Sequence, residues 1–285
     1  MTRRAASDYA ALNRSEPLTF AHRGGAGLWP ENTLEAFRGA LSLGCSHLET
    51  DLRMTRDGHI VACHDARIDR TTDGSGEVSA FTLEELQRFD AGYRFSPDGR
   101  SFPARGRGAR IPSFAELVEA APQAAFNVEI KERGSPDLPQ ALWEFIQRHG
   151  LADRIIVAAE RHPLLRRFRQ LSRGSVATSA SKRECLKFWL ASRLGVTKWL
   201  DISYQALQIP ERVETPSAGR RPGSLRYLTP RLLESAHRLG IRVHVWTIDE
   251  RADMRRLLDF GVDGLMSDYP DRLLEVVRSR NPISR

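Results

Sequence analysis

The sequence contains little cysteine. Only three of its 285 residues are cysteines, Cys45, Cys63 and Cys185, and no C-x-x-C spacing occurs. An odd, scattered set argues against a disulfide framework and against a cysteine zinc site, and it favours a reducing compartment. Apolar runs long enough for a signal peptide or a membrane span are also missing. The sequence therefore predicts a cytoplasmic protein.

Neither sign of charge dominates the chain. Lys and Arg number 43 against 36 Asp and Glu, a formal net charge of +7. The basic residues are spread out and no zinc-finger or RNA-binding signature accompanies them, so nucleic acid is not an expected partner. Arginine suits phosphate, in a small substrate or at an anionic membrane surface. With 41% hydrophobic and 28% charged residues, the composition is that of a soluble globular protein.

Short β-rich runs alternate with longer helical patterns, as in repeated βα units around a parallel sheet. Strands are expected at 18–21, 47–52, 125–130, 154–158, 176–179, 199–203, 242–247 and 264–267. Helices are expected at 34–43, 114–120, 138–149, 163–171, 182–194, 231–239, 252–260 and 272–278. Eight such pairs predict an α/β fold, a closed (β/α)8 TIM barrel, instead of an open doubly wound sheet.

Two segments are too long to be ordinary βα loops. Residues 60–111 include the basic, glycine-rich sequence RGRGAR, and we expect a small insertion there, after the second strand. Residues 208–226 are expected to form another long loop at the active face. Residues 1–16 are interpreted as an N-terminal tail, and the chain 1–285 as a single domain.

The first expected strand ends in the sequence AHRGG. The carboxyl ends of the strands carry catalysis in such barrels, so His22 and Arg23 are candidate site residues by position. Thr33, in the run WPENT that follows, is suited to cap the next helix, which gives Asn32 and Thr33 a structural role. Glu31 lies outside that role and is placed near the site.

Carboxylates two residues apart occur in the second expected strand. Glu49 and Asp51 point to the same side of the strand, which is the barrel interior. Burial of two adjacent carboxylates is costly unless a cation neutralises them, and that cation is either a metal ion or an inward Arg or Lys. Glu129 and Lys131 share one face of the next strand in the same way. The all-oxygen donor set Glu49, Asp51 and Glu129 favours Mg²⁺ or Ca²⁺ over zinc.

Histidines supply the remaining chemistry. His64 lies near the end of the run HIVACHD. His22 and His64 are interpreted as a general acid and a general base, because imidazole titrates near neutral pH. His47 and His244 lie earlier in their strands and are expected to fill the barrel interior. Trp246 is interpreted as an apolar wall for the alcohol part of a substrate, with a buried core tryptophan as the alternative.

As a set, these residues resemble the glycerophosphodiester phosphodiesterase family. The resemblance consists of HRG at 22–24, PENT at 30–33, E-x-D at 49–51, T-x-DG at 55–58, HD at 64–65, RTT at 70–72, VEIK at 128–131, VWT at 245–247 and GVDG with SDYP at 261–270. These motifs are ordered and span nearly the whole chain. Ser267 and Asp249 stand where the family more often has Thr and Asn, and both are expected to lie outside the metal and acid-base sets.

The resemblance implies a barrel that hydrolyses glycerophosphodiesters to an alcohol and glycerol 3-phosphate with a divalent cation, Mg²⁺ or Ca²⁺. It implies that His22 and His64 form the acid-base pair. It also implies that Glu49, Asp51 and Glu129 bind the metal, and that Arg23 and Lys131 form a phosphate clamp.

Other functions remain open at this stage. A lysophospholipase D activity would accept lysophospholipid substrates within the same family, and a related barrel phospholipase or sphingomyelinase is a second alternative. A third is a catalytically inactive phosphate-binding or membrane-surface protein. Such a protein would lack a histidine or carboxylate of the site, and all five are present. No pattern indicates an oligomeric state.

The segment 182–194 combines Lys and Arg with a wide apolar face that includes Phe188 and Trp189. A basic amphipathic helix of this kind can lie at a membrane interface, so a peripheral membrane contact is one of two interpretations. Ordinary packing of the helix on the barrel, with Trp189 buried, is the favoured interpretation.

Overall fold

The structure, a computed structural model, describes residues 4–131, 137–215 and 223–280. Eight parallel strands lie side by side in the order β6-β5-β4-β2-β1-β11-β10-β7. A parallel bridge between Ser179 and Ala206 joins the two ends of this series, so the sheet closes into a barrel. The strands are β1 (Leu18–Ala21), β2 (His47–Met54), β4 (Ala125–Ile130), β5 (Ile155–Ala158), β6 (Ala177–Thr178), β7 (Ala206–Pro210), β10 (Arg242–Trp246) and β11 (Gly264–Ser267).

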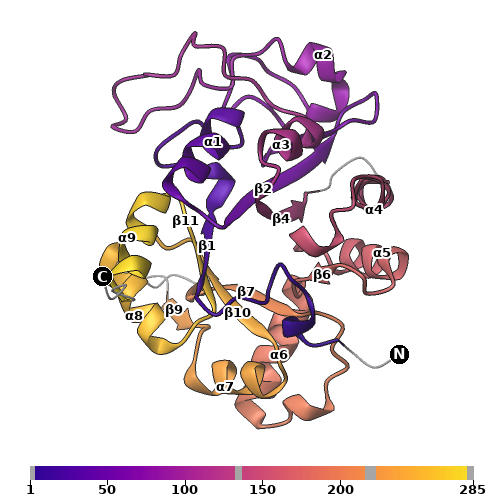
Figure 1. Cartoon of the computed structure of the whole chain (residues 1–285), viewed down its shortest axis with the longest axis vertical. Coiled ribbons are helices and arrows are strands. Elements are labelled where there is room, and N and C mark those ends of the chain that lie inside the picture. The colour runs from indigo at the N-terminus through magenta and orange to yellow at the C-terminus, as the bar shows by residue number, and fades with distance from the viewer. Residues whose placement is uncertain (1–3, 132–136, 216–222, 281–285) are drawn as a thin grey trace.

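Helices surround the strands, as Figure 1 shows. They are α1 (Leu34–Leu43), α3 (Phe114–Ala120), α4 (Leu138–His149), α5 (His162–Ser172), α6 (Lys182–Leu194), α7 (Pro230–Arg238), α8 (Arg251–Phe260) and α9 (Pro270–Arg280). Local signals set their ends: Thr33 caps α1 by accepting a hydrogen bond from the Ala36 amide, and Gly44 ends it in the left-handed conformation. The (β/α)8 TIM barrel and all eight expected helices are confirmed.

One expected strand is wrong. Residues 199–203 form the end of a 3-10 turn (Thr197–Trp199) and a loop, and the barrel strand is β7. This segment counts among the short β-rich runs because of its apolar residues, yet Trp199 is 76% exposed. In β7 itself, the polar residue Gln208 interrupts the apolar pattern. The barrel interior tolerates it because its amide donates a 2.6 Å hydrogen bond to the Asn127 side chain of β4. A polar side chain paired with a distant strand therefore concealed the true strand.

The expected long loop at 208–226 is also partly regular. After β7, β8 (Arg212–Thr215) pairs antiparallel with β9 (Gly223–Arg226). Residues 216–222 of this expected loop lie outside the described residues.

The insertion after β2 begins with β3 (Ile60–Ala62), which pairs antiparallel with the end of β2. It continues through a 3-10 turn (Val78–Ala80) and the short helix α2 (Leu83–Leu86). A small apolar cluster of its own holds it, with Val61, Ile68, Val78, Leu86 and Ile111 all buried. The insertion lies at the top of Figure 1 and supplies one wall of the site described below.

Aromatic and imidazole rings fill the barrel interior. Phe20 lies between His47 and His244, with ring centroids 5.0 Å and 4.9 Å away, and both histidines are fully buried. Burial lowers the pKa of His47 to about 4 and that of His244 to about 3, so both are neutral near pH 7. The expectation that these two histidines fill the interior is confirmed.

The N-terminal segment closes the end of the barrel away from the strands' carboxyl ends. Ala6, Tyr9, Ala11 and Leu12 are buried in one cluster with barrel residues, and the Ala11 carbonyl oxygen is 2.8 Å from His47 Nε2. Residues 1–3 of the expected tail lie outside the described residues. Within the described ranges, no helix has both the length and the apolar character that crossing a membrane requires.

Candidate active site

Three carboxylates meet at the carboxyl ends of β2 and β4. The parallel register pairs Asp51 with Glu129, and Glu49 with Asn127 two residues earlier. One oxygen from each of Glu49, Asp51 and Glu129 lies within 4.8 Å of the others. Glu49 and Asp51 are buried, and a buried carboxylate is stable in its charged form only when a cation lies beside it.

Two basic side chains partly neutralise the cluster. Lys131 Nζ lies 3.0 Å from Glu129 Oε2 and 3.4 Å from Asp51 Oδ1, and Arg23 Nε lies 3.4 Å from Asp51 Oδ2. The ion pairs that the sequence left as an alternative therefore exist. Two cations cannot balance three carboxylates, however, and Glu49 has no Lys or Arg side chain in contact among the described residues.

The pKa values follow from this imbalance. Burial raises the pKa of Glu49 to about 7, and the charge of Asp51 adds to the effect. Burial also raises the pKa of Glu129, whereas Lys131 and Arg23 outweigh burial at Asp51 and lower its pKa. Glu129 Oε1 is buried without a hydrogen-bond partner in the described structure. A buried, unpaired oxygen beside two other carboxylates fits a hard divalent cation.

His22 begins the 3-10 turn (His22–Gly24) that follows β1. Its Nδ1 is 2.6 Å from Asp268 Oδ1 and its Nε2 is 3.9 Å from Glu49 Oε2. An ionised carboxylate only accepts hydrogen bonds, so Nδ1 donates to Asp268 and Nε2 faces the carboxylate cluster. Burial lowers the pKa of His22, but the Asp268 hydrogen bond and the Glu49 charge outweigh it, and the pKa is raised. Asp268 was not among the expected site residues.

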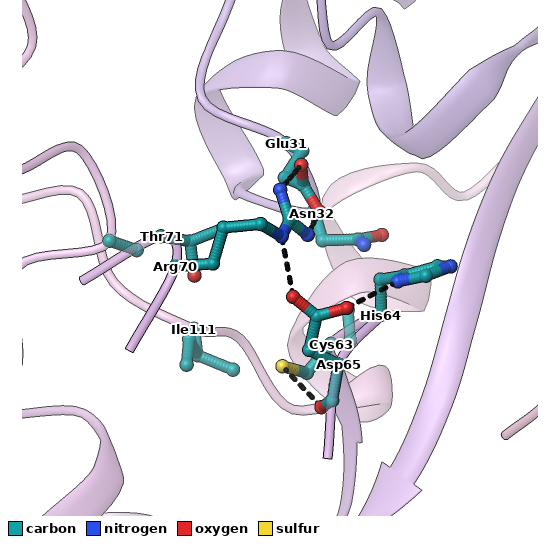
Figure 2. A pocket seen from close by; sticks show the side chains of 10 residues that line it. Glu31, Asn32, Cys63, His64, Asp65, Arg70, Thr71 and Ile111 are labelled. Atoms are coloured by element: carbon teal, nitrogen blue, oxygen red, sulfur yellow. Dashed lines mark hydrogen bonds and ion pairs between the residues drawn. The ribbon is translucent and has the colours of Figure 1, made fainter. Parts of the chain in front are cut away.

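His64 follows β3 and makes a matching pair, with Nδ1 2.7 Å from Asp65 Oδ1. Arg70 Nε donates to Asp65 Oδ2, and the other two guanidinium nitrogens of Arg70 donate to Glu31, both at 2.7 Å. Glu31 also accepts from Arg23 Nη1 at 3.2 Å. Figure 2 shows this row of ion pairs between His64 and Glu31. It confirms that Glu31 lies near the site, and it adds Asp65 and Arg70, which the sequence motifs include without giving them a role.

The row borders a pocket that is lined mainly by residues of the insertion, together with Glu31 and Asn32 (Figure 2). Cys63, Ala91 and Ile111 contribute apolar surface to the pocket, and all three are buried. Burial lowers the pKa of His64, an effect that the Asp51 charge and the Asp65 hydrogen bond reduce.

The backbone beside the carboxylates is held in an uncommon conformation. Arg23 and Asn32 have positive φ values of 50° and 56°. In this conformation the Arg23 amide donates to Glu49 Oε2 at 2.9 Å, and the Asn32 side chain donates to Asp51 Oδ2 at 3.2 Å. Asn32 thus orients a carboxylate of the cluster, beyond the structural role that the sequence indicated. Gly24 has a φ of 83°, and a Cβ there would lie 2.8 Å from Ala36 Cβ, which explains the glycine of the HRG motif.

Ser267 and Asp249 lie closer to the proposed acid-base groups than expected. The Ser267 hydroxyl donates to Asp249 Oδ1 at 3.0 Å, and the Asp268 amide donates to the same oxygen at 2.9 Å. Asp268 forms a hydrogen bond with His22, so Ser267 and Asp249 help to position this proposed catalytic histidine through Asp268. They remain outside the proposed metal and acid-base sets themselves, and they reach His22 only through Asp268, because the loops after β10 and β11 are adjacent in space.

Trp246 is the last residue of β10 and is 40% exposed. The alternative of a buried core tryptophan is therefore wrong. Of the site residues expected from the sequence, Glu49, Asp51 and Glu129 lie within β2 and β4, and the others lie at or just beyond the ends of barrel strands or of β3. Arg53 joins two of the segments, since its guanidinium donates to the His64 carbonyl at 2.6 Å and to the Lys131 carbonyl at 3.2 Å.

Comparison with known proteins gives a consistent result. The model of the glycerophosphoryl diester phosphodiesterase family matches residues 22–272. A glycerophosphodiester phosphodiesterase from Caldanaerobacter subterraneus is 33% identical over 92% of this chain and 98% of its own length, and one from Bacillus subtilis is 30% identical over 94% and 88%. A human lysophospholipase D is 26% identical over 91% of this chain and 85% of its own.

Solved structures share the fold. A glycerophosphoryl diester phosphodiesterase domain from Mycobacterium tuberculosis superposes with a TM-score of 0.80 at 20% identity, covering 94% of this chain and all of that one. A phosphodiesterase from Oleispira antarctica, solved with the product sn-glycerol-3-phosphate, has a TM-score of 0.68 at 22% identity, covering 92% and 97%. The family match over nearly the whole chain decides its membership. The chain belongs to the glycerophosphoryl diester phosphodiesterase family and is a phosphoric diester hydrolase.

Proposed function

We propose that this chain hydrolyses glycerophosphodiesters to an alcohol and glycerol 3-phosphate by metal-dependent acid-base catalysis. The observation that carries the proposal is one cluster of three carboxylates, Glu49, Asp51 and Glu129, flanked by two histidines that each have a carboxylate on Nδ1. The names of its relatives and the product bound to the Oleispira antarctica enzyme support the same substrate class.

Glu49, Asp51 and Glu129 would hold the cation, Mg²⁺ or Ca²⁺, through their oxygen atoms. When bound, such a cation stabilises negative charge on the phosphoryl group and lowers the pKa of a coordinated hydroxyl. Arg23 and Lys131 form the phosphate clamp in this proposal. Both already lie within ion-pair distance of Asp51, so their positive charges face the place where a phosphodiester would approach the carboxylates.

His22 and His64 act as the acid-base pair. One accepts the proton of the attacking oxygen, and the other donates a proton to the departing alkoxide. Asp268 and Asp65 hold the two rings by their Nδ1 atoms, which leaves each Nε2 available for proton transfer. Exposed side-chain fractions of 18% for His22 and 30% for His64 allow each ring to be reached from solvent.

A lysophospholipase D-type activity is a second candidate. The human relative of that name supports it, and the half-exposed Trp246 could wall the alcohol or acyl part of such a substrate. An inactive phosphate-binding protein fits less well, because nothing in the carboxylate and histidine sets is missing.

A substrate panel tests the proposed function. The protein with Mg²⁺ or Ca²⁺ is incubated with glycerophosphocholine, glycerophosphoethanolamine, glycerophosphoglycerol and lysophosphatidylcholine, and free alcohol and glycerol 3-phosphate are measured. We expect both products from the glycerophosphodiesters. Release of choline from lysophosphatidylcholine alone would replace the first proposal with the second, and release from no member of the panel would contradict both.

A prediction concerns Arg70, the link between Glu31 and Asp65. Arg70→Gln should lower turnover about tenfold, because Asp65 would lose the partner that orients it toward His64. A tenfold loss corresponds to the low end of the free energy that a hydrogen bond between charged groups contributes. We expect the low end because half of the Arg70 side chain is exposed to solvent. Steady-state kinetics and thermal unfolding on the same preparations provide the measurement.

Arg67→Gln is the matched control, because Arg67 lies in the same segment and pairs with Asp69 away from the site. Its turnover should equal that of the unchanged protein. If Arg70→Gln behaves like Arg67→Gln, or if its loss of turnover merely tracks a lower melting temperature, Arg70 does not position His64.

A further inference from the structure

Exposed apolar side chains gather on one segment of the surface. Among the described residues, nine large hydrophobic side chains are exposed, and five of them lie on α6 and the turn that follows it. These are Leu186, Leu190, Leu194, Val196 and Trp199, which we call the α6 stripe. The spacing of four residues puts the three leucines on one helix face. Leu194 and Trp199 are three-quarters exposed, at 75% and 76%.

The α6 stripe is not what holds the helix on the barrel. A different face does this, with Phe188 fully buried and Trp189 partly buried against Tyr227 at a ring separation of 5.8 Å. The favoured interpretation of Trp189, as a packing residue, is therefore the one that the structure supports. The exposed leucines form a second apolar face, without a partner in the described structure.

Positive charge borders the stripe. Five basic side chains of the same segment are exposed: Lys182, Arg183, Lys187, Arg193 and Lys198. The single acidic residue between Lys182 and Trp199, Glu184, turns inward, where it pairs with Arg169 at 2.7 Å and accepts from the Ser181 amide at 2.8 Å. The outer surface of the segment is thus apolar and cationic.

We propose that the α6 stripe docks on an anionic lipid bilayer. Leucine and tryptophan side chains enter the interfacial region of a bilayer, while adjacent Lys and Arg contact the lipid phosphates. A second copy of the chain is a poorer occupant, because a symmetric contact would bring five cations against five others. Charge complementarity thus selects a lipid surface over self-association.

The location of the stripe determines how the bound enzyme faces solvent. In a βα unit the helix runs back from the carboxyl end of its strand, so Leu194, Val196 and Trp199 lie toward the end of the barrel opposite the candidate active site. Figure 1 shows α6 at the edge of the molecule opposite the insertion that walls the site. A docked molecule would keep its site open to water-soluble substrates.

Vesicle flotation of the full chain tests this proposal. At low salt we expect the protein to float with vesicles of phosphatidylglycerol and phosphatidylcholine, and to stay unbound with phosphatidylcholine alone. The double variant Lys187→Gln/Lys198→Gln should bind about 25-fold more weakly, since each basic residue near an anionic surface contributes about fivefold. Leu194→Ser/Trp199→Ser should also lose binding, with unchanged melting temperature and unchanged turnover of a soluble substrate, because both side chains are exposed.

Arg38→Gln/Arg255→Gln is the control, with the same change of net charge on exposed residues of α1 and α8. It should float like the unchanged protein. Three results would overturn the proposal: no flotation with anionic vesicles at low salt, equal weakening by the control and stripe variants, or a dimer in solution that Leu194→Ser/Trp199→Ser converts to monomer.

Discussion

Replacing His22 with Ala is expected to lower turnover of a good glycerophosphodiester about 100-fold to 10,000-fold, the usual contribution of a positioned acid or base. His64→Ala should cause a loss of the same order. Neither ring belongs to the barrel core, and neither is needed to neutralise the carboxylate cluster, so folding and metal affinity should be largely retained. Turnover, metal affinity and thermal unfolding are measured on each variant.

The double variant separates joint from independent action. If the two histidines act in one concerted step, His22→Ala/His64→Ala should lose much less than the product of the two single losses. His149→Ala, at the exposed end of α4, is the control and should keep full turnover. Unchanged turnover of His22→Ala would show that His22 is structural, and the acid-base assignment would then be wrong.

Removal of the metal is expected to abolish turnover altogether. Dialysis against EDTA should inactivate the protein, and Mg²⁺ or Ca²⁺ should restore it, because the three carboxylates retain excess negative charge after pairing with Arg23 and Lys131. Glu49→Ala should weaken metal affinity by more than about 100-fold, since even indirect support of a ligand is worth about 10-fold to 100-fold. It should lower turnover as well, which distinguishes it from the histidine variants.

Isothermal titration and thermal unfolding with added metal give readouts that do not depend on activity. The unchanged protein should melt at a higher temperature as metal is added, and Glu49→Ala should not respond, because only binding to the folded state stabilises it. Glu35→Ala, exposed on the first turn of α1, is the control. Full turnover after exhaustive chelation would end the metal proposal.

Local patterns predicted the fold well. Caps and periodicity identified the eight helices, and seven of the eight strands were recognised by their apolar runs. The exception, β7, shows why an apolar pattern does not identify every strand. Gln208 is acceptable inside the barrel because Asn127, 81 positions away in the sequence, accepts its hydrogen bond. An apolar pattern contains no information about such a distant partner.

The candidate active site likewise has features that follow from local sequence and features that depend on distant contacts. The sequence by itself determined that Glu49 and Asp51 share one face, because alternation along a strand is a local property, and it placed His22 at a strand end. Only the tertiary structure decided that Asp268 orients His22 and that Arg70 joins Glu31 to Asp65. The first pair is 246 positions apart, and it forms because closure of the barrel puts β1 beside β11. Contacts of this kind depend on how the strands close around the barrel, which no local stretch of sequence specifies.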